Sequence, residues 1–126
     1  MSWQAYVDSN LVGTGKINKA AILGQQGGVW ATSSGYNLTP EEQAAIVKTF
    51  QNPENAQATG VRAAGQKFFC LSANDRSVYG KKSADGIVIV KTTQAVLVAE
   101  YAHPTVPGEA TKIVEELADY LIGVGY

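Results

Sequence analysis

Few side chains in this sequence have the types and spacing that catalysis needs. His103 is the only histidine and Cys70 the only cysteine, which excludes an internal disulfide and a metal site built from several such residues. Together they could form one thiol–imidazole nucleophile. Cys70, however, lies in the strand-like run FFCLS, where a cysteine is typically a small apolar residue of the interior. His103 precedes Pro104, and we expect it in a solvated loop.

The carboxylates are also poorly arranged for acid–base chemistry. They include two adjacent pairs, Glu41-Glu42 and Glu115-Glu116, both in helix-like segments. Neighbours on a helix point about 100° apart, so neither pair converges on one substrate. The run GTGK lacks the full spacing of a phosphate-binding loop. We therefore expect no enzymatic activity, no metal site and no cofactor.

The composition is that of an ordinary globular domain. The chain has 126 residues, is 45% hydrophobic and 17% charged, and has a formal net charge of −1. We expect a single domain over residues 1–126, no bulk electrostatic binding of nucleic acid, and neither a membrane-spanning helix nor a signal peptide. A lone cysteine suits a reducing, intracellular compartment. Six of the ten basic residues nevertheless fall in one stretch: Arg62, Lys67, Arg76, Lys81, Lys82 and Lys91.

Hydrophobic periodicity and turn signals predict an α+β fold. Ser2 is a candidate N-cap, and Thr39-Pro40-Glu41-Glu42 predicts a capping box. The expected elements are, in order, a helix to about residue 11, strands at 19–23 and 29–32, a helix at 40–50, an irregular loop at 51–60, strands at 66–72, 76–82, 87–93 and 94–101, and a helix at 109–123. Short, closely connected strands favour an antiparallel sheet, which the helices would cover.

Aromatic residues gather near both ends of the sequence, where packing is hardest to guarantee. Trp3 and Tyr6 in the first helix and Tyr120 in the last lie at the margins of the apolar stripes that would pack on the sheet. Tyr126 follows Gly125, and we expect so terminal a residue to order few other groups. Either these rings complete the core, or they share one partly exposed surface.

The opening run Ser2-Trp3-Gln4-x-Tyr6-x-Asp8 resembles the N-terminal signature of profilins. The runs GTGK, GQKFF, DRSVYGKK and PGEATKIVEELADYLIGVGY extend the resemblance over the whole chain in order, and it is strongest to the profilins of fungi. The resemblance implies a central antiparallel β-sheet with the N- and C-terminal helices packed side by side on one face and shorter helices on the other. It also implies a cytoplasmic, cytoskeletal protein that regulates actin polymerisation. Its implied partners are monomeric actin, bound at the barbed-end face, proline-rich proteins such as formins, and phosphatidylinositol bisphosphate headgroups.

The resemblance also assigns residues to two surfaces. A proline-rich (polyproline) ligand would bind an aromatic groove at Trp3, Tyr6, Trp30, Leu117, Tyr120 and Tyr126. Actin would bind the later strands and the start of the last helix, at Lys67, Arg76, Tyr79, Lys81, Lys91, Gly108, Lys112 and Glu116. Much of the basic stretch falls on this second surface, with a sign that suits an acidic partner. Ser72 stands where several relatives have arginine, which lowers the positive charge available to a phosphoinositide headgroup.

Two alternatives stay open at this point. One is a small intracellular ligand-sensing α+β domain whose aromatic residues line an internal pocket. The other is an enzyme that uses Cys70. Titration of the tryptophan fluorescence with polyproline separates the aromatic groove from both alternatives, because only a surface groove predicts a response to that peptide.

Overall fold

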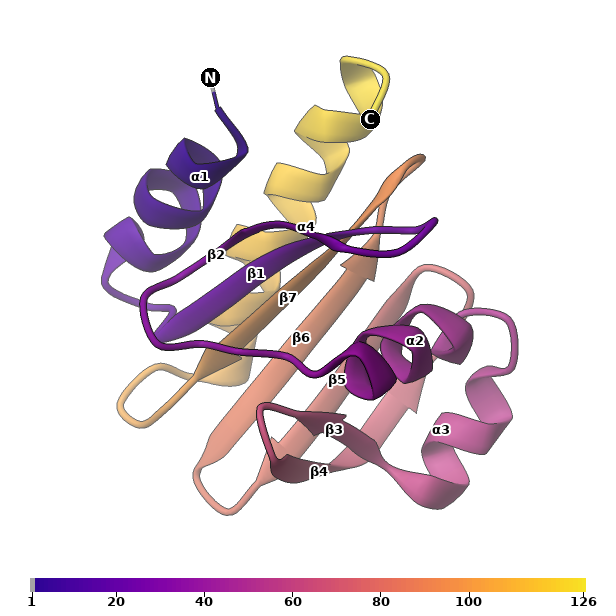
Figure 1. Ribbon diagram of the computed structural model, residues 1–126. Helices are drawn as coiled ribbons and strands as arrows, with labels where there is room; N and C mark the ends of the chain where they lie inside the picture. Colours follow the sequence, from indigo (N-terminus) through magenta and orange to yellow (C-terminus); the bar gives the residue numbers. More distant parts are fainter. Residues whose placement is uncertain (1) are drawn as a thin grey trace.

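The computed structural model describes residues 2–126 and places helices on both faces of one sheet (Figure 1). Its elements are, in chain order, α1 (Trp3–Ala5), η1 (Tyr6–Leu11), η2 (Val12–Thr14), β1 (Lys19–Gly24), β2 (Val29–Thr32), α2 (Pro40–Thr49), α3 (Pro53–Thr59), β3 (Val61–Ala63), β4 (Gln66–Ala73), β5 (Ser77–Lys82), β6 (Asp85–Lys91), β7 (Ala95–Tyr101) and α4 (Pro107–Gly123). The helices and strands expected from the sequence are all present.

The first three elements form one continuous N-terminal helix. It begins as predicted at Ser2, whose hydroxyl accepts a hydrogen bond from the N–H of Ala5 at 3.1 Å. The middle part, η1, is a π-helix, and η2 tightens into a 3₁₀ turn that ends at Gly15 with a positive φ of 78°. Val7 and Leu11 of η1 are fully buried against the sheet. This packing gives the helix a fixed position although it is short.

The sheet has seven antiparallel strands in the order β2-β1-β7-β6-β5-β4-β3. Side chains alternate between its faces, so β6 serves two cores. Val88 and Val90 pack with the N-terminal helix and α4, whereas Ile87 and Ile89 pack on the face that α2 covers. Figure 1 shows the N-terminal helix and α4 on one face and α2 with α3 on the other. The predicted α+β arrangement is confirmed.

The prediction of an irregular loop at 51–60 is wrong. Asn52 caps α3, because its side-chain oxygen accepts from the N–H of Asn55 at 3.4 Å, and Pro53 occupies the first helical position. Gly60 ends the helix with a positive φ of 80° and leads into β3. The turn-forming residues of NPEN therefore start a helix here.

Glu42 connects α2 to the turn between β3 and β4. As the capping box predicts, its carboxylate accepts from the N–H of Thr39 at 2.9 Å. The same carboxylate accepts from the N–H groups of Ala64 at 3.1 Å and Gly65 at 2.8 Å. Both turn residues have positive φ, so the turn presents its donors to one acceptor. Burial acts to raise the pKa of Glu42, but these N–H donors outweigh it, and the net pKa is lowered.

We predict that Glu42→Ala lowers the free energy of unfolding by about 2 kcal/mol at neutral pH, because three backbone donors lose a charged acceptor. Glu41→Ala is the matched control, since Glu41 lies exposed in the same helical turn. Denaturant unfolding of both variants measures the difference. Since the folded-state pKa of Glu42 is lowered, its contribution should be complete above the ordinary carboxyl pKa and should be lost as the pH falls through the lowered value. Equal stabilities of the two variants at neutral pH would contradict this role.

Candidate functional site

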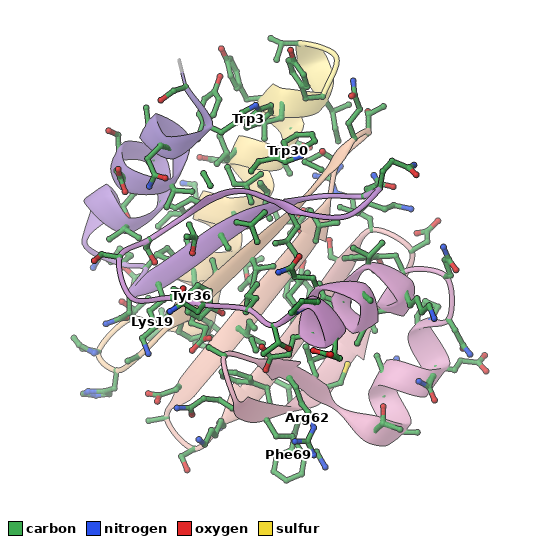
Figure 2. All side chains as sticks on the ribbon, viewed as in Figure 1. Trp3, Lys19, Trp30, Tyr36, Arg62 and Phe69 are labelled. Carbon is green, nitrogen blue, oxygen red and sulfur yellow. The ribbon has the colours of Figure 1, made fainter. Side chains whose placement is uncertain are left out.

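Five aromatic side chains from both ends of the chain and from β2 gather at one end of the molecule. We call them the aromatic cluster: Trp3, Tyr6, Trp30, Tyr120 and Tyr126. The ring centroid of Trp3 lies 5.6 Å from that of Tyr6, 4.7 Å from that of Trp30 and 5.0 Å from that of Tyr126. The ring of Tyr6 lies 6.2 Å from that of Tyr120. Trp3 is therefore the centre of the cluster, and Figure 2 shows it next to Trp30.

The cluster is partly in the core and partly in solvent. Tyr120 and Tyr126 are 54% and 42% exposed, whereas Tyr6 is only 8% exposed. Leu117 is buried in the core cluster against which Trp3 and Trp30 pack. The sequence placed Tyr6 at the margin of the apolar stripe, and the structure buries most of its ring in the core while one edge lines the space between the N-terminal helix and α4. The two interpretations of the terminal aromatics are thus both correct in part: buried rings support exposed ones.

Trp30 reaches the cluster because a glycine lies beneath its indole. A Cβ atom built on Gly24 would lie 2.6 Å from Nε1 of Trp30 and 2.9 Å from its Cε2. Gly24 ends β1, and its N–H donates to the carbonyl of Gly28 across the hairpin at 3.0 Å. The hairpin between β1 and β2 therefore sets the position of the tryptophan, a relation that no local sequence signal indicates.

Tyr126 is anchored by its backbone. Its main-chain oxygen accepts from the N–H of Gln94 at 2.5 Å and from the hydroxyl of Thr92 at 2.6 Å, both in the turn between β6 and β7. Its own N–H donates to the carbonyl of Leu121 at 2.8 Å. Gly125, with a positive φ of 96°, makes this return of the chain possible. The expectation that the terminal residue orders few other groups is wrong.

A groove continues from the aromatic cluster between the N-terminal helix and α4. Its volume is about 380 Å³. We call it the interhelical groove, and its lining residues are Tyr6, Asn10, Thr14, Ile113, Glu116, Leu117 and Tyr120. Because Tyr6 and Tyr120 belong to both features, the groove and the cluster form one continuous surface.

The other flank of α4 borders a part of the sheet that the helices leave open. Phe69 on β4 is 73% exposed and Leu71 is 61% exposed. Phe69 pairs with Lys81 of β5, and Lys67 pairs with Arg62 of β3, so these side chains share a face. We call this surface the open sheet face, and Figure 2 shows the ring of Phe69 projecting outward from it.

Phe69, Leu71 and Arg62 were absent from the predicted site. A signal for Phe69 existed, because the adjacent pair Phe68-Phe69 in a strand must point to opposite faces. Phe68 is buried and Phe69 is not. The sequence could not show whether a helix covers the outer face, and that decides the exposure of Phe69.

Arg76 and Tyr79 are held to α4 by acidic side chains. Arg76 donates to Glu115 at 3.2 Å and to Asp119 at 2.7 Å. The hydroxyls of Ser77 and Tyr79 both donate to the second carboxylate oxygen of Glu115. The bond to Asp119 is the main cause of a raised pKa for Arg76, and burial, followed by Glu115, raises the pKa of Tyr79. These residues fix α4 against β5, a role that the sequence did not indicate.

The remaining residues that the resemblance assigned to actin lie in several places. Gly108 and Lys112 are exposed on the first turns of α4. Nζ of Lys91 lies 5.9 Å from the ring centroid of Phe50, which packs on the sheet face covered by α2. Glu116 lines the interhelical groove. Lys91 and Glu116 therefore lie apart from the open sheet face.

Cys70 does not have the surroundings of a catalytic thiol. Burial raises its pKa, which disfavours the reactive thiolate. It lies on β4, while the exposed His103 follows β7, with β5 and β6 between those strands. Within residues 2–126 no group of three or more His, Cys, Asp or Glu side chains could hold a metal ion. No helix in this described part of the chain is long and apolar enough to cross a membrane.

Comparisons with known proteins agree with this geometry. A family model described as Profilin matches residues 1–126. The profilin of Saccharomyces cerevisiae is 55% identical over 127 residues, covering 100% of both chains. A crystallised profilin of Schizosaccharomyces pombe, 52% identical, matches 99% of this chain and 100% of its own with a TM-score of 0.97. A structure of mouse profilin IIa in complex with a double repeat from the FH1 domain of mDia1 has a TM-score of 0.83 at 21% identity over both full chains, a likeness of fold.

We predict that Gly24→Ala displaces the indole of Trp30 and thereby disturbs the aromatic cluster without unfolding the chain. The new methyl group cannot remain 2.6 Å from Nε1 of Trp30, whereas the backbone of Gly24 has no positive φ that would exclude alanine. Near-ultraviolet circular dichroism and tryptophan emission should both change. Gly108→Ala is the control, since its Cβ would meet nothing within 4 Å. Spectra of Gly24→Ala that match the unmodified protein would show that the ring does not depend on this glycine.

Proposed function

The chain belongs to the profilin family, whose members are non-enzymatic actin-binding proteins, and we propose that it regulates actin polymerisation through two surfaces joined by α4. The aromatic cluster would bind proline-rich segments. The open sheet face, with Gly108 and Lys112, would bind monomeric actin at its barbed-end face. The observation that carries the proposal is the exposure of two sets of large apolar side chains on opposite flanks of α4. We further propose a cytoplasmic, cytoskeletal location.

The aromatic cluster suits a polyproline II helix. Such a ligand is already extended before it binds, so it loses little conformational entropy. Its proline rings can pack on the exposed faces of Tyr120 and Tyr126, and its carbonyls have no internal partners. The indole N–H groups of Trp3 and Trp30 and the tyrosine hydroxyls are the donors available to them. The mouse profilin IIa complex with an FH1 double repeat supports this proposal through a protein of the same fold, and formins are the class of partner we expect.

The open sheet face suits an acidic protein surface. Phe69 and Leu71 would form an apolar centre, and Arg62, Lys67 and Lys81 a cationic rim around it. An apolar core with a polar rim is the usual anatomy of a protein–protein interface. Bound at the barbed-end face, the protein would block nucleation and addition at pointed ends while permitting growth at barbed ends.

We propose phosphatidylinositol bisphosphate headgroups as a third, weaker ligand of the same cationic rim. Such headgroups would compete with actin, because Arg62, Lys67 and Lys81 cannot pair with both. Ser72 is exposed on β4 near this rim and contributes no charge. Binding of the headgroup would use charges alone, whereas binding of actin would use apolar contacts as well. Added salt should therefore weaken binding of the headgroup more than binding of actin.

We predict that Tyr126→Ala weakens binding of octaproline about fivefold to thirtyfold, which is the loss of one contact worth about 1–2 kcal/mol. The substitution removes the ring but retains the backbone bonds of residue 126 to Thr92 and Gln94, so the melting temperature should change little. Tryptophan fluorescence titration measures the affinity. Val124→Ala, which truncates another exposed side chain of the same segment, is the control. Unchanged binding by Tyr126→Ala would remove this ring from the site.

We predict that Phe69→Ala weakens binding of monomeric actin at least about tenfold, because it removes the largest apolar side chain of the open sheet face. The ring is 73% exposed, so the fold should tolerate its loss. Val29→Ala on β2, at the opposite edge of the sheet, is the control. Sedimentation of labelled actin monomers with each variant gives the affinities, and octaproline binding should stay unchanged in both. Full actin affinity in Phe69→Ala would place the interface elsewhere.

A further inference from the structure

Glu116 is the one charged side chain among the residues that line the interhelical groove. It is exposed, and within residues 2–126 no Lys, Arg or His nitrogen lies within salt-bridge distance of its carboxylate. Lys112 lies one turn earlier on α4. Lys16 pairs with Glu109 in the first turn of α4, at 3.0 Å. The groove thus contains one carboxylate with which no basic side chain of residues 2–126 pairs.

The adjacent residue Glu115 differs from Glu116 in its contacts. Glu115 lies on the other flank of α4, where Arg76, Ser77 and Tyr79 all donate to it. Successive residues of a helix point about 100° apart, so the two glutamates serve different surfaces. One carboxylate is used in holding the fold together, and the other faces a groove.

The groove is within reach of a ligand bound to the aromatic cluster. The steps from Trp3 to Tyr6 and from Tyr6 to Tyr120 measure 5.6 and 6.2 Å between ring centroids, and a polyproline II helix rises about 3.1 Å per residue. At most about four residues of the ligand would therefore extend from Trp3 to Tyr120. Glu116 lies one helical turn from Tyr120, about 6 Å along the axis. One to three further residues of the ligand would reach its carboxylate.

The lining of the groove indicates which side chain would fit there. Tyr6, Ile113 and Leu117 offer apolar and aromatic walls, and Asn10, Thr14 and Glu116 offer polar groups among them. Arginine has an apolar stem that can lie along such walls, a planar guanidinium that stacks on aromatic rings, and a geometry that matches a carboxylate. An acidic side chain in the same place would be repelled.

We infer that the interhelical groove is a specificity subsite, in which Glu116 favours proline-rich segments that carry an arginine shortly beyond the proline run. The inference rests on the proposed function of the aromatic cluster as a polyproline site. It gives Glu116 a role in ligand choice, whereas the sequence resemblance placed this residue at the actin surface.

The test uses fluorescence titration of the full chain with five peptides. They are octaproline alone, octaproline with one arginine at its N-terminal or at its C-terminal end, and the two matching peptides with citrulline, which has the shape of arginine without the charge. In the unmodified protein, arginine at one of the two ends should bind about two- to fivefold more tightly than citrulline, the range of an exposed ion pair. Added salt should reduce this preference.

Glu116→Gln should abolish the preference for arginine over citrulline. Glu54→Gln on α3, an exposed glutamate far from the groove along the chain, should retain it. Glu116→Lys should reverse the charge preference of the groove. In this variant, octaproline with a glutamate at the same end should bind more tightly than the matching peptide with glutamine. If octaproline binds but the arginine and citrulline peptides have equal affinities for the unmodified protein, the inference is wrong. It is also wrong if the preference for arginine survives in Glu116→Gln. Either result would leave the proposed polyproline site intact. Failure of octaproline itself to bind would instead overturn the proposed polyproline site.

Discussion

The burial of α4 on the sheet is the constraint on which both candidate surfaces depend. Its apolar stripe is almost completely removed from solvent: Ala110, Val114, Leu117, Ala118 and Leu121. Each of the larger side chains contributes about 1.5–3 kcal/mol on burial. Because these residues recur every three to four positions, they fix the rotation of the helix about its axis as well as its position. Every other side chain of α4 is consequently assigned to one flank or the other.

The two flanks are stabilised in different ways. On the side of β5, Glu115 and Asp119 bind Arg76, so polar contacts join helix and sheet next to the open sheet face. On the side of the N-terminal helix, contact is mainly apolar, through Tyr6 and the buried residues beneath it. The aromatic rings at the chain ends can be exposed because the backbone behind them is held: Ser2 caps the first helix, and the turn between β6 and β7 binds the main-chain oxygen of Tyr126. This explains how terminal residues can form a defined surface.

The sequence predicted most elements, because helical stripes and capping residues are local signals. It also brought Trp3, Tyr6 and Tyr120 together, since both terminal helices had one face for the sheet. Trp30 could be added only through the resemblance to profilins, which the comparisons confirm. What the sequence missed depends on long-range contacts: the second role of Glu42 at the turn between β3 and β4, the exposure of Phe69 beside α4, and the bonds of Arg76 and Tyr79 to Glu115. The helix at 53–59 was missed for another reason, because its capping residues are also common in turns.

We propose that one helix, α4, serves two surfaces that can be occupied together. The most direct measurement is the affinity of the chain for monomeric actin, determined by sedimentation with and without saturating octaproline. If the surfaces are separate, the coupling free energy is near zero and the actin affinity should change by less than about twofold, with actin, profilin chain and labelled peptide sedimenting in one complex. Displacement of actin by octaproline would contradict the account, because it would show that the two ligands share a surface.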